Sequence, residues 1–375
     1  MHLDALMRFF SIILTFLVIT VACKKNKVKE SEKKSYPVTE SKDFLSANSD
    51  TVTITAVGDI MLGSNYPSAS FLPGVNILEG IVPVLKEKTD LIVGNLEGTL
   101  FDSGGKPKEC SDPNFCFVFR SPFAYGNYLK EAGFDFLSIA NNHSNDFGAF
   151  GRNATEKNLK NLGIQYAGVL NHCEYAIKEK NRIRYAFIGA GHSPGLISSV
   201  HYADIKRVIK EVRPKADIII VMFHGGGEGA SYQHIPFKNE FYAGENRGNV
   251  VEFAHVCIDA GADLILGSGP HVARAVELYN NKFIAYSLGN FATYGKITLT
   301  GPNGNAPILK IKTDTKGNFI SCRVISVIQS KGSKKGPEID TNHKAYNYIK
   351  YLTYTDFPNN HFVFSPSGEI KIIKR

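Results

Sequence analysis

The stretch TVTITAVGD, residues 51–59, decides the fold class of this chain. β-branched and apolar residues alternate as far as Val57, which is the pattern of a β-strand. Gly58 and Asp59 then supply a turn with a carboxylate at the carboxyl end of that strand. In open α/β sheets, ligands collect beyond the carboxyl ends of the strands. The stretch therefore predicts a sheet whose C-terminal edge carries polar chemistry.

The same arrangement recurs along the chain. Apolar runs meet polar residues at Asp90–Val93 before Asn95 and Glu97, Phe134–Ala140 before Asn141-Asn142-His143, Ile218–Phe223 before His224, Leu264–Leu266 before Gly267–His271, and Phe283–Leu288 before Asn290. Helical spacing lies between them, at Ala124–Ala132, Arg152–Leu162, Ala203–Val212 and Val250–Ala260. This alternation predicts an α/β domain.

The central strands are apolar throughout, as in Ile218–Val221 and Leu264–Leu266, which indicates sheets covered on both faces. After Gly295 the helical alternation gives way to short β-like runs. The runs are Ile308–Lys312, Phe319–Ile328 and Glu369–Ile373. They predict either a small β-rich appendage or the edge of the main sheets.

The N-terminus has the sequence pattern of a signal peptide. The apolar run Phe9–Ala22 is short for a membrane span and ends just before Cys23. This ending resembles the lipobox of bacterial lipoproteins, with Thr20 where Leu is usual, and a start at Met7 would give a more ordinary basic n-region. We expect a signal peptide over residues 1–23 and a lipid on Cys23. The alternative is an uncleaved N-terminal membrane anchor, and either places the domain outside the cytoplasm.

Composition and charge narrow the class of protein. With 43% hydrophobic and 21% charged residues, the chain is expected to bury a sizeable core. Its net charge is +8, but residues 24–34 hold six lysines against two glutamates, which accounts for half of it. Residues 24–50 are predicted to be a flexible Lys/Glu/Ser tether. The remaining charge is too mild for nucleic-acid binding.

The cysteines leave one pairing open. Cys110 and Cys116 flank five residues, and in an oxidising compartment they could close a small loop by a disulfide. The alternative is two free thiols. Their spacing, without neighbouring histidines, matches no usual zinc pattern.

Taken singly, the strand-end residues are weak signals: Asp59 could cap a helix, the Asn141-Asn142 pair could form a turn, and His224 could be a core histidine. Taken together, they are oxygen and nitrogen donors at five strand ends. They would repel one another or lose hydration at a cost unless a cation lay between them. A donor set without thiolate suits Mn, Fe, Zn or Mg.

Seven ordered motifs give a resemblance to a known family. They are GDIMLG at 58–63, GNLEG at 94–98, FRSP at 119–122, ANNH at 140–143 with Asp146, HGGGE at 224–228, PHV at 270–272 and YSLGNF at 286–291. This series resembles that of the CapA family of poly-γ-glutamate capsule synthesis proteins, whose fold belongs with the calcineurin-like metallophosphoesterases. The resemblance implies a four-layer αββα sandwich over residues 51–294, with 295–375 as a β-rich C-terminal extension on the same domain.

The resemblance also implies roles for individual residues. His143 becomes the general acid, with Asp146 as the residue that would orient it. Ligands for one or two divalent ions would be Asp59, Asn95, Glu97, Asn142, His224 and His271; substrate-binding residues would be Arg120, Glu228 and Asn290. The family usually has a histidine where this chain has Gly269. Either Glu228, His192 or water replaces that imidazole, or one metal position is weak, or the site binds without catalysing.

We therefore expect a lipid-anchored, extracytoplasmic protein of the bacterial envelope. Its expected activity is metal-dependent hydrolysis of a phosphoester or related bond in a capsule or envelope polymer, and capsule-synthesis membrane proteins are expected partners. The alternative is a non-catalytic accessory protein that holds an acidic polymer such as poly-γ-glutamate. A plain solute-binding protein would explain the sheet but not the ligands at its edge.

Overall fold

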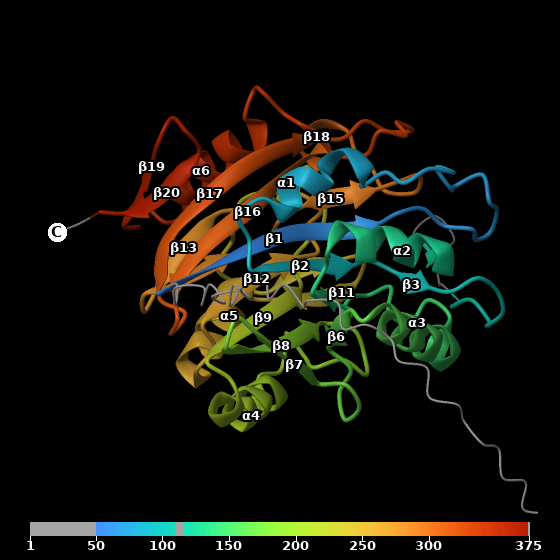
Figure 1. The fold of residues 1–375 in the computed structure, drawn as a ribbon, viewed down its shortest axis with the longest axis horizontal. Helices are drawn as coiled ribbons and strands as arrows, with labels where there is room; N and C mark the ends of the chain where they lie inside the picture. The colour runs from blue at the N-terminus through green and yellow to red at the C-terminus, as the bar shows by residue number, and fades with distance from the viewer. Residues whose placement is uncertain (1–49, 110–115, 374–375) are drawn as a thin grey trace, which may run out of the picture. The chain divides into compact units, whose positions relative to one another are not determined.

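Two β-sheets packed face to face form the centre of the fold (Figure 1). The computed structural model describes residues 50–109 and 116–373. The first sheet runs β19-β20-β17-β16-β1-β2-β5-β6, with β15 paired to β1 and β18 to β17; the second runs β13-β14-β12-β9-β8-β7. The predicted signal peptide with Cys23, the tether up to residue 49, and Cys110 lie outside the described residues.

The strands of the first sheet are β1 (Thr51–Met61), β2 (Leu91–Leu96), β5 (Phe136–Ser138), β6 (Gln165–Ala167), β15 (Asn290–Thr293), β16 (Asn305–Asp314), β17 (Phe319–Ile328), β18 (Glu338–Ile339), β19 (Phe362–Phe364) and β20 (Glu369–Ile372). The second sheet contains β7 (Tyr175–Lys180), β8 (Ile183–Gly191), β9 (Ile218–His224), β12 (Leu264–Ser268), β13 (Val276–Tyr279) and β14 (Lys282–Ala285). Two short ladders pair β3 (Thr99–Leu100) with β4 (Arg120–Ser121) and β10 (Glu240–Tyr242) with β11 (Glu245–Gly248).

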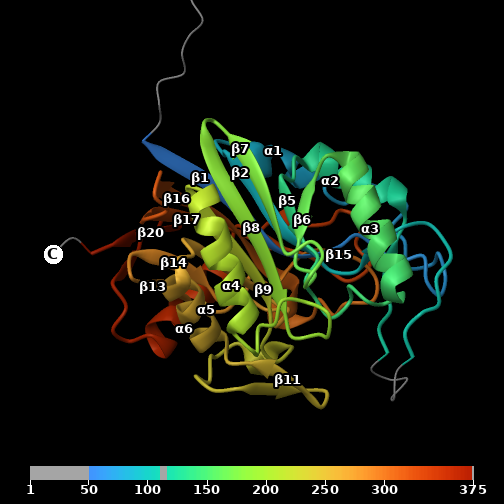
Figure 2. The ribbon, with the colours of Figure 1, turned by 90° about the horizontal axis from the view of Figure 1, so that it is seen from below.

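The α-helices are α1 (Val82–Lys86), α2 (Phe123–Ala132), α3 (Gly148–Leu162), α4 (Ala203–Val212), α5 (Val250–Ala260) and α6 (Lys344–Asp356). Helices α1 to α3 cover the outer face of the first sheet, and α4 and α5 cover the second (Figure 2). No helix in the described ranges is long and apolar enough to cross a membrane.

The core follows from the apolar strands. In β9, Ile218 and Ile220 point between the sheets, whereas Ile219 and Val221 point toward α4 and α5. All four are fully buried, because each face of this strand is covered. The same division on the first sheet produces the four-layer αββα sandwich that the family resemblance implied.

The C-terminal segment joins the main sheet. Strand β16 pairs antiparallel with β1 along Thr51–Ala56, and β17 pairs with β16 on its other edge. Helix α6 contributes Tyr346 and Ile349 to the core between the sheets. Of the two alternatives left open by the sequence, the edge of the main sheets is therefore the one observed.

Candidate metal centre

Parallel strands bring the predicted ligands to one edge of the sandwich. In the first sheet, Asp59 of β1 lies in register with Asn95 of β2, and in the second, His224 of β9 lies in register with Ser268 of β12. Parallel strands end at the same edge, so their terminal side chains converge. Asp59, Glu97 and His224 are all buried and each offers a ligand atom within 4.8 Å of the others.

Asn95 holds the two carboxylates in place. Its side-chain N–H groups donate to Asp59 Oδ1 at 2.8 Å and to Glu97 Oε2 at 2.6 Å. Its own Oδ1 accepts a hydrogen bond from Asn141 Nδ2 at 3.0 Å. Asn95 thus positions both carboxylates, and because an amide oxygen has two lone pairs, its Oδ1 keeps one for a metal.

Several ligand-type atoms at this edge, Asn290 Oδ1 among them, are left without hydrogen-bond partners in the described residues. Glu97 Oε1, Asn142 Oδ1 and His224 Nε2 are buried and have no hydrogen-bond partner among residues 50–109 and 116–373. Burial, and then the charge of Asp59, raise the pKa of Glu97 well above its ordinary value. Burial also lowers the pKa of His224 well below its ordinary value. Buried polar atoms are costly when unpaired, so this donor set fits a divalent cation.

His271 supplies a positive charge to the cluster. It follows β12 with a left-handed φ of 57°, and its Nδ1 lies 2.9 Å from Asp59 Oδ2. Burial disfavours the charged imidazole, but the hydrogen bond to Asp59 and the nearby carboxylates outweigh it and raise the pKa of His271 to about 10. A metal ligand must be a neutral imidazole, so a cation bound here would displace this proton.

His143 is oriented by one contact at its ring edge and one on its ring face. Its Nδ1 lies 2.8 Å from Asp146 Oδ2, and its ring stacks on Phe119 at 4.1 Å between centroids. Asp146 is fixed in turn by the Phe119 backbone N–H at 2.6 Å and by Lys108 Nζ at 2.6 Å. Burial lowers the pKa of His143, and the charge of Asp146 opposes that shift. The Nε2 atom is left facing Glu97 Oε1, at 3.9 Å.

A pocket of about 180 Å³ lies beside the two histidines that contact the cluster. His143 and His271 line it together with Phe119, Glu228, Tyr242 and Lys296. Sequence reasoning missed Phe119 as a ring partner, Tyr242 and Lys296. Only the FRSP motif pointed to one of them, and it gave no hint of stacking.

The three predicted substrate-binding residues are placed differently. Glu228 lines the pocket and pairs with Arg247 at 2.8 Å. Arg120 is not among the pocket's lining residues: its guanidinium lies over the ring of Phe147 at 5.0 Å and donates to Asn65 Oδ1 at 2.6 Å. Arg120 therefore supports the neighbouring loop.

Asn290 is also absent from the residues that line the pocket. Its side-chain amide donates to the backbone carbonyls of His271 at 3.2 Å, Thr298 at 3.3 Å and Asn303 at 3.1 Å. These three bonds hold the loop that presents His271. In this structure, Asn290 positions a predicted ligand.

The backbone at Gly269 is shaped for glycine. Its φ is +112°, and a Cβ atom there would lie 2.9 Å from both the N and the O of Gly225. A histidine would not fit without a backbone shift. Of the predicted substitutes, the ring of His192 lies 5.9 Å from that of His224 but contacts Glu245, and Glu228 lies 4.0 Å from His271 Nε2.

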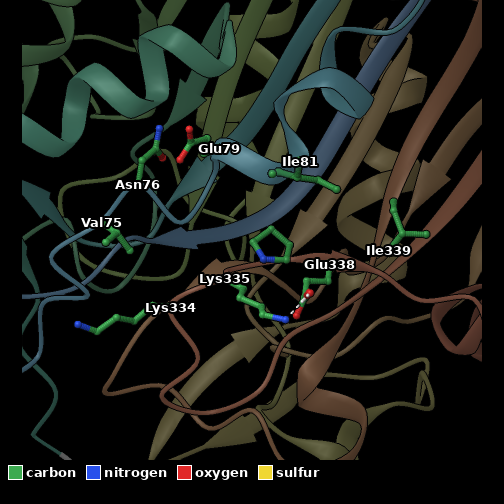
Figure 3. Close-up of a pocket in the computed structure, with 10 residues that line it drawn as sticks. Val75, Asn76, Glu79, Ile81, Lys334, Lys335, Glu338 and Ile339 are labelled. Carbon is green, nitrogen blue, oxygen red and sulfur yellow. Dashed lines mark hydrogen bonds and ion pairs between the residues drawn. The ribbon is translucent and has the colours of Figure 1, made fainter.

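A larger pocket, of about 700 Å³, lies away from these strand ends (Figure 3). Glu79, Lys334 and an ion pair between Lys335 and Glu338, at 3.4 Å, line it together with apolar side chains. The candidate metal-ligand groups found in the described ranges include none of these residues. The smaller pocket, which His143 and His271 line, is therefore the candidate site.

The disulfide prediction is tested only at one end. Cys116 is disulfide-bonded. Because Cys110 lies outside the described residues, the pairing with it stays a prediction.

Comparisons with known proteins find the family that the sequence motifs resemble. Residues 53–294 match the family described as bacterial capsule synthesis protein PGA_cap. "Capsule biosynthesis protein CapA" of Bacillus anthracis is 30% identical over 261 residues, 64% of this chain and 60% of that protein. "PGA biosynthesis protein CapA" of Bacillus subtilis is 26% identical over 299 residues, 76% of this chain and 71% of that protein. A "Probable polyglutamine synthesis accessory protein" of Mycobacterium tuberculosis is 27% identical over 311 residues, covering 66% and 75%.

Solved structures give looser matches. A hypothetical protein from Thermus thermophilus has a TM-score of 0.47 at 15% identity, covering 74% of this chain and all of that one. A putative 5'-nucleotidase from Staphylococcus aureus has a TM-score of 0.44 at 14% identity, covering 80% and 58%. With TM-scores this low, neither match carries an argument about activity.

Proposed function

Because this chain belongs to the bacterial capsule synthesis protein family PGA_cap, we propose that it is a metal-dependent hydrolase of a phosphoester or related bond in a capsule or envelope polymer. One observation carries the proposal: the buried cluster of Asp59, Glu97 and His224 keeps unpaired ligand atoms beside an oriented imidazole. The chain spans about 60% of the length of the Bacillus anthracis relative, and the names of the relatives support a role with an anionic polymer.

The ligand set would comprise Asp59, Glu97, Asn142, His224 and His271. When bound, a divalent ion supplies Lewis acidity toward a phosphoryl or carbonyl oxygen. Asn95 would hold Asp59 and Glu97 in place, and its Oδ1, which accepts one hydrogen bond from Asn141, remains a further candidate ligand.

The chain's own proton donor is His143. When its Nδ1–H donates to Asp146, the ring carries a proton on Nε2 only as the imidazolium, the form that the charge of Asp146 favours and burial opposes. In that form Nε2, on the side facing Glu97, would give its proton to a leaving oxygen. Stacking on Phe119 fixes the plane of the ring and keeps water off one of its faces. Lys296 lines the same pocket and offers a cation to an anionic substrate.

The test uses purified full-length protein, stripped by a chelator and reloaded with Mn²⁺, Fe²⁺, Zn²⁺ or Mg²⁺. We expect cleavage of a generic phosphomonoester or phosphodiester with at least one ion. His143→Ala should lower kcat by about 10²–10⁴-fold, the usual contribution of a general acid, while bound metal is retained. The exposed His201→Ala is the matched control. Absence of any bound metal after reloading, or full activity in His143→Ala, would contradict the proposal.

A second candidate function is a non-catalytic accessory role, in which the pocket holds an acidic polymer. The specific observation in its favour is the glycine-shaped backbone at Gly269, which removes one expected imidazole. It predicts that metal-loaded protein binds poly-γ-glutamate and turns over nothing in a broad ester panel. A Gly269→His variant is a poor discriminator, because its side chain would collide with Gly225.

We further propose that the domain is held outside the cytoplasm by a lipid on Cys23. The support is the apolar run ending in Thr20-Val21-Ala22 just before this cysteine. Mass spectrometry of the membrane fraction should find a lipidated N-terminal Cys23. An uncleaved chain in that fraction would favour a membrane anchor instead, and a soluble chain that begins elsewhere would refute both.

A further inference from the structure

Helix α3 packs against β6 (Figure 2). A second group of ligand-type side chains joins this helix to the loop that follows β6. Glu156 comes from α3, and His172 and Cys173 come from the loop. A carboxylate oxygen, an imidazole nitrogen and the sulfur atom lie within 4.8 Å of one another. None of these residues belongs to the strand-end cluster around Asp59, and the sequence motifs did not include them.

The carboxylate of Glu156 is buried, and only one of its two oxygens lies within hydrogen-bonding distance of a nitrogen or hydroxyl group. Its side chain is 9% exposed, and its Oε2 lies 2.8 Å from His172 Nε2. In the part of the chain that the structure describes, no N–H or O–H group donates to its Oε1. A buried carboxylate oxygen without an N–H or O–H donor is costly. The Cys173 thiol hydrogen-bonds to this carboxylate as a weak donor, and a divalent cation would replace it as a stronger partner.

The loop that carries the other two groups is held by its backbone. The carbonyl of Cys173 accepts from the N–H of Gly168 at 2.8 Å and of Val169 at 3.2 Å. Asn171 takes a left-handed φ of 58°, which reverses the chain just before the ligands. Because the backbone is fixed in this way, little ordering is left for a ligand to impose.

Access to the group is from solvent. The His172 side chain is 58% exposed, so an ion can reach its nitrogen without opening the core. Cys173 is half-buried and is a free thiol rather than part of a disulfide. A thiol with an imidazole and a carboxylate is a typical donor set for Zn²⁺ and related borderline ions.

We propose that Glu156, His172 and Cys173 form a second divalent-metal site, for Zn²⁺ or a similar thiolate-binding ion. Binding replaces the S–H proton of Cys173 by a metal–sulfur bond and releases that proton to solvent, while the imidazole binds neutral and the carboxylate ionised. Three protein ligands leave a fourth position for water.

Occupancy would join α3 to the loop after β6. Helix α3 begins at Gly148, directly after the loop that carries His143, and Arg152 on its second turn donates to Asn145 of that loop at 2.8 Å. The metal would thus stabilise the helix on which the His143 loop rests. This inference does not depend on hydrolysis, because it uses none of the residues of the first cluster.

The sulfur ligand makes the two sites separable by spectroscopy. Co²⁺ bound to oxygen and nitrogen donors gives no sulfur-to-cobalt charge-transfer band, whereas a thiolate ligand gives one in the near ultraviolet. We expect full-length protein titrated with Co²⁺ to show this band, and Cys173→Ser to lose it. The matched control, Cys257→Ala, removes a free thiol that is buried in another part of the core and should keep the band.

His172→Ala and Glu156→Gln should each weaken Co²⁺ binding at this band by at least about 10-fold, the lower end of what losing even a supporting partner costs. A measurement on the unmodified protein guards against misfolded variants: Zn²⁺ should slow alkylation of Cys173 by iodoacetamide, followed by mass spectrometry. No band in the wild type, a band that survives in Cys173→Ser, or equal alkylation with and without Zn²⁺ would overturn the proposal.

Discussion

Replacing Glu97 by Gln should stabilise the metal-free protein and remove most of its response to metal. Glu97 is 1% exposed and lies with Asp59 in a cluster whose ligand atoms are within 4.8 Å of one another. At 4.8 Å and an effective dielectric constant of about 20, two like unit charges repel by about 3.5 kcal/mol. The charge on His271 offsets part of this, so at a pH where Glu97 is ionised we expect Glu97→Gln to gain about 1–2 kcal/mol without metal.

Bound metal should make the wild type more stable than Glu97→Gln, the reverse of their order without metal. At free Mn²⁺ 100-fold above its Kd, the wild type gains about 2.7 kcal/mol by mass action. If losing this ligand weakens binding by about 100-fold, the same Mn²⁺ concentration gives Glu97→Gln only about 0.4 kcal/mol. The Cys173→Ser background removes the thiolate site from the measurement.

Thermal unfolding after chelation and across a Mn²⁺ titration measures both effects. A free-energy change of 1 kcal/mol moves Tm by about 2–4 °C in a domain of 150–250 residues, and by less in a larger one. The control is Glu79→Gln, an exposed carboxylate away from the cluster. The reasoning is refuted if Glu97→Gln destabilises the metal-free protein, or if its Tm rises with Mn²⁺ as far as that of the wild type.

The same pair of proteins makes a prediction about pH. Burial and the charge of Asp59 raise the pKa of Glu97 above its ordinary value of 4.5, so the folded state holds this proton more tightly than the unfolded state. The penalty is absent below pH 4.5 and grows as pH rises toward the raised pKa. Metal-free wild type should therefore lose stability relative to Glu97→Gln over this window. A stability difference that does not change with pH would count against it.

Two further substitutions test the supports of the site by chemical denaturation. Gly269→Ala should lower the free energy of unfolding by about 1–3 kcal/mol more than Gly195→Ala. Both positions have positive φ, but only at Gly269 would a Cβ lie 2.9 Å from backbone atoms. Equal losses of stability in the two variants would contradict this. Arg274→Met should lower the free energy of unfolding by about 3–5 kcal/mol, because it leaves Glu240 buried without its bidentate partner. Arg184→Met breaks an exposed ion pair and should change the stability little. A small loss of stability in Arg274→Met would show that the buried pair adds no stability.

The regular elements of the sandwich could be predicted because their signals are local. The apolar run Ile218–Phe223 became β9, and the helical spacing at Ala203–Val212 and Val250–Ala260 gave the bounds of α4 and α5. The sequence analysis missed the β7–β8 hairpin. Strand β7 is half-exposed and rich in lysine, and its turn depends on left-handed φ values at Asn181 and Arg182, a weak signal in sequence.

Strand-end ligands were also predictable, since β-strand periodicity and a following polar residue are visible in sequence. Asp59, Glu97 and His224 do meet at one edge. The direction in which a side chain points was not predictable. The side-chain oxygen of Asn95 accepts a hydrogen bond from Asn141, and the guanidinium of Arg120 lies over the ring of Phe147. Such contacts join residues far apart in the chain, and no local pattern records them.

The backbone conformation at Gly269 explains why this chain has no histidine there. From the sequence, Gly269 could be identified only as the position where the family usually has a histidine. In the fold it is a residue with φ of +112° packed against Gly225, so the loop is built around the absence of a side chain. The proposed metal site would therefore be completed by other groups, of which Glu228 lies near His271 in the pocket.

The most direct test of the account is to locate the ion. Crystals of the chelated protein reloaded with Mn²⁺ would be measured at the manganese absorption edge for anomalous scattering. The account predicts a peak bound by Asp59, Glu97 and His224, with Glu97 Oε1 and His224 Nε2 among the ligand atoms. A fully reloaded crystal with no peak at these three residues would contradict the claim that this strand edge is a metal centre.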